Sequence, residues 1–323
     1  RGGLVGSEMC IRDSVEGTVE VWEAPRFAGG ASFGGCFNIM GPGQFVTQPN
    51  TFINNTPDPG GGIVDIDVVN RTVHRVESSP LECDVYRTPR DGADGWLYVG
   101  SDNTNTTIVV DHNGTEVGSY AGFARPFFDA QGRLLAKSGD FDGVGDYVEL
   151  DPLTGDVVAE ALFTANRATA TNGGKFISVI FERMDGPVPD PSGLLDAATY
   201  EVVVDLSAET GRAISGRASA DDSRFGYVSK DDRLLVWDTS SGELVIDVSV
   251  AERAERIAFS PDGSSIALLV DAGTLQIRSG DDGQIVRTFD VSREPVMAMD
   301  WANEDQIAVL RTFGVVDIVA TQG

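Results

Sequence analysis

The residues with the clearest potential for chemistry lie in one acidic segment. The segment GDFDGVGDYVELD spans residues 139–151, and Asp140, Asp142 and Asp146 offer carboxylate oxygens of the kind that bind calcium. The spacing departs from that of an EF-hand loop, because Val144 stands where the third ligand would be. The same segment fits a turn between two strands, and we favour that interpretation over a calcium site.

Other side chains with catalytic or metal-binding potential are few and widely spaced. His74, in an expected outer strand, and His112, in an expected turn, suit surface positions better than the base of a hydrolytic triad. Cys36 and Cys83 lie 47 residues apart and lack the compact spacing of a zinc site. We expect buried free thiols, with a disulfide as the alternative. The sequence therefore predicts no enzyme, no bound metal and no cofactor.

The net charge of the chain argues against some classes of partner. The sequence has 24 Lys and Arg against 50 Asp and Glu, a formal net charge of −26 at pH 7. Such a surface repels phosphate backbones and anionic bilayers, so we expect no direct contact with nucleic acid or with a membrane. No apolar run approaches the roughly 18–20 residues of a membrane-spanning helix.

The first 14 residues need a separate interpretation. The stretch LVGSEMCIRDS, residues 4–14, has neither a strand nor a helix period and lacks the apolar core of a secretory signal. It resembles a translated transposase-type sequencing adapter throughout. We therefore expect residues 1–14 to be non-native and disordered, and natural coding sequence to begin in mid-gene near Val15. Residues 15–323 are then expected to form a single domain.

A repeated pattern runs through the rest of the chain. Apolar runs that end on an acidic or small residue recur as GTVEVWE, IVDID, TIVVD, YVELD, YEVVVD, LLVWD, LQIRS and VVDIV. Their last residues, 23, 67, 111, 151, 205, 238, 279 and 319, are separated by 44, 44, 40, 54, 33, 41 and 40 residues. A mean step of about 42 is typical of four-stranded propeller blades. The long step contains residues 184–198, which we expect to be an exposed loop, and the short step predicts a shortened outer strand.

Residues 256–291 show how one such unit folds. The sequence RIAFSPDGSSIALLVDAGTLQIRSGDDGQIVRTFDV alternates four apolar runs with three turns. Pro261 and Gly263 suit the first turn, because Pro fixes φ and Gly accepts a positive φ. One four-stranded sheet cannot bury both of its faces, so several such units must pack around an axis. The sequence therefore predicts an all-β propeller.

Three motifs are similar to a known family. AFSPDG at 258–263, LLVWDTSSGELV at 234–245 and GTVEVWE at 17–23 resemble WD40-repeat β-propellers, and in particular the degenerate bacterial type. The Gly-His dipeptide of the family is absent, so its buried histidine-centred network cannot form. The resemblance implies seven blades, with GTVEVWE closing the last blade as its outer strand. Eight blades are the alternative.

The resemblance also implies a function and a site. Propellers of this family present loops at one rim to protein partners, and Asp231, Arg253, Asp271 and Arg293 fall in such loops. We therefore predict a protein-interaction platform, monomeric and cytoplasmic, that forms the C-terminal part of a larger bacterial signalling or regulatory protein.

Two other functions stay open at this point. A secreted propeller enzyme of the lactonase or quinoprotein kind would need metal ligands or cofactor-stacking aromatics around the axis. Trp22, Trp96, Trp237 and Trp301 stand in strand contexts that suit packing instead. A secreted calcium-dependent binding module would depend on the acidic segment 139–151 alone.

Overall fold

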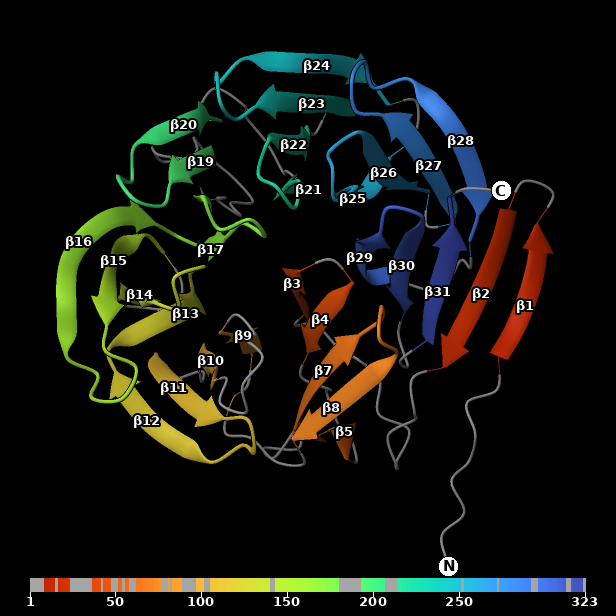
Figure 1. Cartoon of the computed structure of the whole chain (residues 1–323). Coiled ribbons are helices and arrows are strands. Elements are labelled where there is room, and N and C mark those ends of the chain that lie inside the picture. Colours follow the sequence, from red (N-terminus) through yellow and green to blue (C-terminus); the bar gives the residue numbers. More distant parts are fainter. Residues whose placement is uncertain are drawn as a thin grey trace, which may run out of the picture.

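The computed structural model shows a ring of seven antiparallel sheets, the blades, around a central axis (Figure 1). The structure describes residues 9–14, 17–23, 37–41, 43–47, 52–53, 56–57, 62–76, 81, 83–88, 97–101, 105–139, 143–179, 193–206, 214–229, 231–250, 253–271, 273–291, 296–311 and 315–321. Within these ranges the chain forms strands and turns, and no helix there could cross a membrane. The prediction of an all-β, seven-bladed propeller is confirmed, and the eight-bladed alternative is wrong.

The blades follow one another along the chain, and we number the strands of each blade from the axis outwards. Blade 1 consists of β3 (Phe37–Gly41), β4 (Gln44–Thr47), β7 (Ile63–Asp67) and β8 (Thr72–Val76), with a ribbon of β5 (Phe52–Ile53) and β6 (Thr56–Pro57) between β4 and β7. Blade 2 consists of β9 (Cys83–Arg87), β10 (Leu97–Ser101), β11 (Thr106–Asp111) and β12 (Glu116–Ala121). Blade 3 consists of β13 (Phe123–Phe128), β14 (Leu134–Ser138), β15 (Gly145–Leu150) and β16 (Val157–Ala165).

The remaining blades continue the same order around the ring. Blade 4 consists of β17 (Ala168–Ala170), β18 (Phe176–Val179), β19 (Gly193–Asp196) and β20 (Val202–Asp205). Blade 5 consists of β21 (Ile214–Ala218), β22 (Arg224–Val228), β23 (Arg233–Asp238) and β24 (Leu244–Ser249). Blade 6 consists of β25 (Ala254–Phe259), β26 (Ser265–Val270), β27 (Thr274–Ser279) and β28 (Ile285–Asp290). Blade 7 consists of β29 (Val296–Asn303), β30 (Gln306–Arg311), β31 (Val315–Ala320), β2 (Gly17–Glu23) and β1 (Met9–Ser14).

The two ends of the chain meet in blade 7. Strand β2 pairs with β31, with Val19 opposite Val319 and Glu23 opposite Val315, so it has the place of an outer strand. Strand β1 pairs with β2 and adds a fifth strand (Figure 1). The expectation of disorder does not hold for Met9–Ser14, because the free edge of β2 offers its backbone groups to the segment that precedes it.

The third strands account for six of the eight runs in the repeated sequence pattern, GTVEVWE is the outer strand β2, and the remaining run needs a correction. YEVVVD, which ends at residue 205, contains β20, the outer strand of blade 4. The third strand of that blade is β19, in which Leu194 and Leu195 are fully buried. Counting to Asp196 turns the uneven steps into 45 and 42 residues. The prediction of an exposed loop is therefore wrong for residues 193–196, while 184–192 lie outside the described residues.

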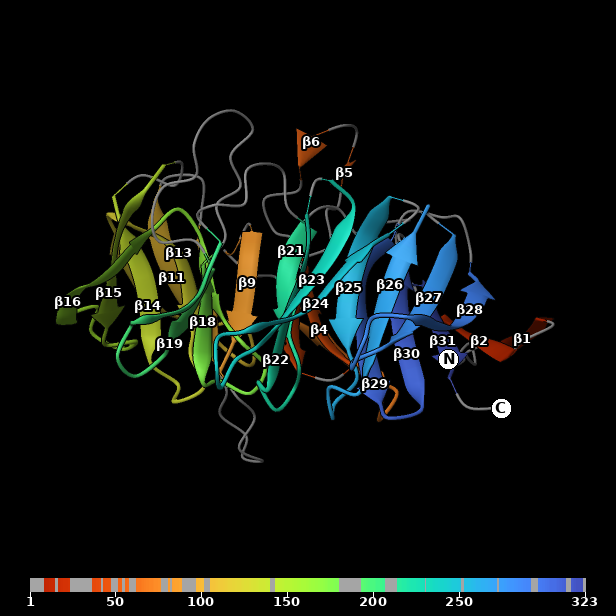
Figure 2. The same ribbon diagram turned by 90° about the horizontal axis from the view of Figure 1, so that it is seen from above.

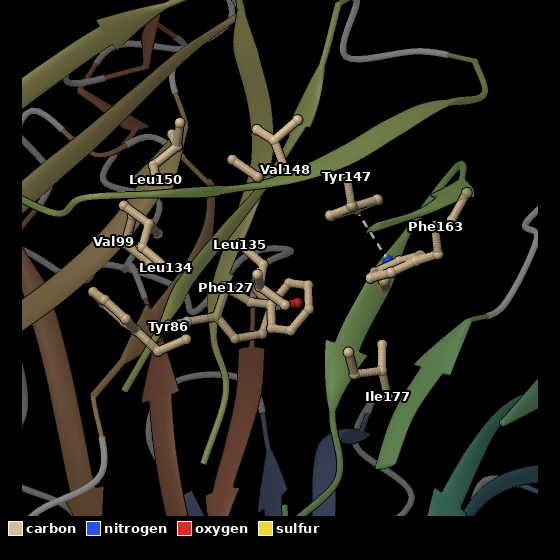
Figure 3. Packing of buried hydrophobic residues seen from close by; sticks show 14 of the residues in the cluster. Tyr86, Val99, Phe127, Leu134, Leu135, Tyr147, Val148, Leu150, Phe163 and Ile177 are labelled. Carbon is tan, nitrogen blue, oxygen red and sulfur yellow. Dashed lines mark hydrogen bonds between the residues drawn. The ribbon is translucent and has the colours of Figure 1, made fainter. Parts of the chain in front are cut away.

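The core lies between neighbouring blades, where the two middle strands of each sheet are buried. Tyr147 on β15 stacks on Phe163 with ring centroids 4.8 Å apart, and its hydroxyl accepts a hydrogen bond from the Ala168 backbone N–H at 3.1 Å (Figure 3). Phe127 of β13 and Ile177 of blade 4 belong to the same cluster. This cluster joins blades 2, 3 and 4, as expected of sheets that cannot bury both faces alone.

Two buried ion pairs connect strands of the ring. Arg87 on β9 lies 3.1 Å from the carboxylate of Asp65 on β7, and its guanidinium donates to Gln44 at 2.9 Å. These contacts join blades 1 and 2. Arg311 and Asp317 form a second buried pair within blade 7, at 2.8 Å. Removing one partner of such a pair leaves an uncompensated buried charge, so each pair helps to specify the packing.

Candidate interaction surface

One face of the ring, the rim face, carries the loops between second and third strands and the segments that lead into the first strands. Both kinds of loop lie on the same face because neighbouring strands are antiparallel. It is the upper face in Figure 2, where β9 begins. Asp231, Arg253 and Asp271 lie in these loops of blades 5 and 6, and all three are exposed. The fourth predicted rim residue, Arg293, lies outside the described residues.

Backbone hydrogen bonds fix the loops of the rim face to one another. The Asp271 N–H donates to the Arg253 carbonyl at 3.1 Å, and the Val250 N–H donates to the Asp232 carbonyl at 2.6 Å. Asp232 and Asp271 have φ values of 55° and 47°, in the left-handed region, which Asp adopts more often than most other non-glycine residues. The rim charges of blades 5 and 6 are therefore held on an ordered backbone.

The acidic residues that end the third strands have a structural role on the opposite face, the turn face. Each carboxylate accepts hydrogen bonds of 2.8 to 3.1 Å from backbone N–H groups two to four residues ahead. These residues are Asp67, Asp111, Asp151, Asp196 and Asp238. The N–H groups of Thr154 and Leu153 hold the pKa of Asp151 below its ordinary value. The repeated acidic residue thus caps the turn, and this structural role accounts for its recurrence.

The histidines join two blades. The His74 Nε2 atom on β8 lies 2.8 Å from the carbonyl oxygen of His112, which stands in the turn after β11. Asn113 in turn lies within hydrogen-bond distance of the His112 ring. Neither contact places a histidine beside a nucleophile, which a triad would require.

The acidic segment 139–151 is described only in part. Asp146 stands on β15, where its carboxylate accepts a hydrogen bond from the Thr164 hydroxyl of β16 at 2.6 Å. Asp140 and Asp142 lie outside the described residues. Among the residues that are described, no group of three potential metal ligands comes together.

The remaining residues singled out in the sequence occupy packing positions or fall outside the description. Trp237 and Trp301 are buried, and Trp237 lies against Phe225 with ring centroids 6.2 Å apart. The side chain of Trp22 and the whole of Trp96 are not described. The same holds for the side chain of Cys83 and for Cys36.

A group of charged residues near the ring axis was not found from the sequence. We call it the axial cluster; its members are Arg217 and the residues whose charges act on it, Tyr86, Arg167, Arg256 and Asp300. They belong to the first strands of blades 2, 5, 6 and 7 or, in blade 4, directly precede one, and the first strands surround the axis in Figure 1. One signal was present in the sequence, because Arg167 and Arg256 each stand four residues before the turn that follows a first strand.

Comparison with known proteins supports the architecture. Residues 226–304 match the family model of the anaphase-promoting complex subunit 4 WD40 domain. That segment, about a quarter of the chain, is similar to a WD40 domain, and the fold of the chain is that of a seven-bladed β-propeller. No curated protein matches this chain significantly in sequence.

Solved propellers of similar shape extend the likeness over nearly the whole ring. The Cps50 (Swd1) propeller domain of Myceliophteria thermophila superposes with a TM-score of 0.61 at 12% identity, covering 93% of this chain and 99% of that one. A chain of a mitotic checkpoint complex has a TM-score of 0.62 at 9% identity, covering 94% and 91%. KlHsv2 with a replaced loop has a TM-score of 0.60 at 11% identity, covering 88% and 90%. At such identities these likenesses concern the fold.

Proposed function

We propose that the rim face is a docking surface for a protein partner, and that this WD40 propeller is the interaction platform of a larger bacterial signalling or regulatory protein in the cytoplasm. WD40 propellers are typically such platforms, and one similar fold comes from a mitotic checkpoint complex. We further propose that the ring acts as a monomer. The net charge of −26 favours a protein partner over nucleic acid or an anionic membrane.

The observation that carries this proposal is the ordered placement of opposite charges on one face. Asp231, Arg253 and Asp271 are exposed. The backbone hydrogen bond between Arg253 and Asp271 holds their two loops next to each other. Exposed charges on a rigid backbone give specificity through charge complementarity, mainly by speeding correct encounters. The turn face differs, because many of its carboxylates are engaged by their own turns.

A matched pair of variants tests the docking face. Asp231→Lys on the rim face and Glu243→Lys on the turn face make the same change of charge at exposed positions. Proteins captured from source cells by the wild type are identified by mass spectrometry, and the purified partner is then titrated against both variants. We expect Asp231→Lys to weaken binding by roughly tenfold and Glu243→Lys to change it by less than about twofold. Equal effects of the two variants would contradict the assignment of the rim face.

A further inference from the structure

The chain contains two Asn-Gly dipeptides, and both lie in turns where the asparagine is exposed. Asn113–Gly114 follows β11, and Asn172–Gly173 lies between β17 and β18. Such a dipeptide is prone to one reaction without an enzyme, in which the backbone nitrogen of the glycine attacks the side-chain carbonyl carbon of the asparagine. Glycine favours the attack because it has no Cβ atom to hinder the approach. The surroundings of the two glycine nitrogens therefore decide how fast each dipeptide reacts.

The N–H of the attacking nitrogen has a different acceptor at the two sites. The Gly114 N–H donates to the backbone carbonyl of Asp111 at 2.9 Å. The Gly173 N–H donates to the Oδ1 atom of Asp222, in blade 5, at 3.3 Å. A backbone carbonyl does not take up a proton, whereas a carboxylate within hydrogen-bond distance can act as a general base. Of the two dipeptides, the one in blade 4 has a base in place.

Contacts within the fold hold Asp222 in this position. Only 1% of the residue is exposed. Its Oδ2 atom accepts hydrogen bonds from the Lys175 N–H at 2.7 Å and the Thr171 hydroxyl at 2.8 Å, while Oδ1 faces the Gly173 nitrogen. Burial raises the pKa of the Asp222 carboxyl above its ordinary value, although the hydrogen bonds from Lys175 and Thr171 oppose the shift. The carboxylate is therefore a stronger base than an exposed one.

The same contact requires a glycine at position 173. A Cβ atom there would lie 2.6 Å from the Oδ2 atom of Asp222 and 2.8 Å from the Ala220 carbonyl oxygen. The N–H lies in the plane of its peptide group, so the bond to Asp222 leaves the two faces of that group open to the asparagine side chain. Asn172 and Gly173 are both exposed, so water can reach a product formed there.

We propose that Asn172–Gly173 is a site of spontaneous deamidation that Asp222 assists. The Gly173 nitrogen attacks the Cγ atom of Asn172 while its proton passes to the Asp222 carboxylate. Asp222 then gives the proton to the side-chain nitrogen, which leaves as ammonia when its bond to Cγ breaks. A succinimide ring remains, and the carboxylate is restored. Water opens the ring at either carbonyl and leaves aspartate or isoaspartate at position 172.

Incubation of the folded full chain at pH 7, followed by peptide mass spectrometry, tests the proposal. The tryptic peptide 168–175 contains no asparagine besides Asn172. We expect Asn172 to convert about tenfold or more faster than Asn113, and Asp222→Asn to slow its conversion by about tenfold or more, because the general base is lost. Asp221→Asn is the matched control, since it makes the same change at the exposed neighbouring residue. It should leave the rate within about twofold.

Two further conditions separate a base from a loosened turn, which would speed the conversion. In denaturant the two residues are linked only through the 50 positions between 172 and 222, so Asn172 should convert more slowly than in the folded chain and at a rate similar to Asn113. At pH 9 hydroxide removes the proton at either site, so the advantage of Asn172 should shrink. The proposal is overturned if Asn113 converts as fast as Asn172 in the folded chain at pH 7, if Asp222→Asn does not slow the conversion, or if unfolding speeds it.

Discussion

Blades 4 and 6 occupy equivalent places in the ring, yet their sequences differ greatly in regularity. The four strands of blade 6 have six residues each, and the blade lies within the segment that matches a WD40 family model. Those of blade 4 have three or four residues, and 13 residues that are not described separate β18 from β19. Both blades nevertheless bury their middle strands. Burial of two middle strands is thus the requirement for a blade, and a regular repeat is one way to meet it.

The contacts to blade 5 differ in the same way. Blade 6 makes an apolar contact, in which the ring of its Phe259 packs directly against Gly226 of blade 5. The approach is so close that a Cβ atom added at Gly226 would lie 2.5 Å from the ring. Blade 4 instead meets a buried carboxylate of blade 5, Asp222, which accepts hydrogen bonds from the Lys175 N–H at 2.7 Å and the Thr171 hydroxyl at 2.8 Å. The short strands of blade 4 leave backbone donors at its turn that need a polar partner.

The largest expected effect tests whether both blades contribute equally to the core. Leu195→Ala on β19 and Leu275→Ala on β27 truncate fully buried leucines of third strands. Each should lower the free energy of unfolding by about 2–5 kcal/mol, through lost burial and the cavity that remains. Denaturant unfolding followed by tryptophan fluorescence measures both. If Leu195→Ala cost less than about 1 kcal/mol, blade 4 would not be an equal member of the ring.

The next effect concerns the polar contact between blades 4 and 5. Asp222→Ala should lower the free energy of unfolding by about 2–4 kcal/mol, because it leaves buried donors at Thr171 and Lys175 without an acceptor. The φ of 59° at Asp222 adds strain for alanine. Asp222→Asn keeps an acceptor and should cost less. Thermal melts of both variants decide the matter, and equal costs would show that charge alone is responsible.

The apolar contact between blades 5 and 6 allows the converse test. Gly226→Ala adds one methyl group against Phe259 and should cost about 1–3 kcal/mol through overpacking. The double variant Gly226→Ala/Phe259→Leu should recover part of the loss, because leucine leaves more room. A double-mutant cycle on thermal stability measures the coupling, and strictly additive costs would refute direct contact.

The smallest effect concerns the turns after the third strands. Asp196 of blade 4 accepts two backbone hydrogen bonds at 2.9 Å, whereas Ser279 of blade 6 accepts one at 3.2 Å. Asp196→Ala should cost about 1 kcal/mol at neutral pH and Ser279→Ala less. Hydrogen bonds from Thr199 and Ala198 lower the pKa of Asp196 below 3.8.

That lowered pKa makes the turn prediction dependent on pH. The stabilisation by Asp196 is present above about pH 4 and is lost as the pH falls through the lowered pKa of the folded state. The cost of Asp196→Ala should therefore shrink in acid, while the cost of Ser279→Ala should not change. Unfolding at pH 7 and at pH 3 compares them, and a cost of Asp196→Ala that grows in acid would contradict the assigned role.

The strands of blade 6 could be predicted from the sequence, whereas those of blade 4 could not. In blade 6 the pattern of residues 256–291 predicts four strands and their turns, because each six-residue apolar run and the Pro-Asp-Gly turn can be recognised from adjacent residues alone. In blade 4 the four-residue strand β19 follows a segment rich in Pro and Gly, so its sequence resembles a loop. Its strand state depends on pairing with Phe176–Val179 and on burial, which are not local properties.

The candidate sites divide in the same manner. The loops of Asp231, Arg253 and Asp271 could be located from the order of strands and turns along the chain, and their proposed role comes from the resemblance to WD40 propellers. The axial cluster depends on distances between blades, since Tyr86 and Arg217 are separated by half the ring. No repeat unit contains that information.

By itself, the sequence determined the blade step, the turn chemistry and the all-β class, because each depends on residues close together in the chain. Tertiary structure decided which short run completes blade 4 and which charges meet at the axis. Both depend on closure of the ring, which brings remote first strands around one line and buries strands too short to be stable alone.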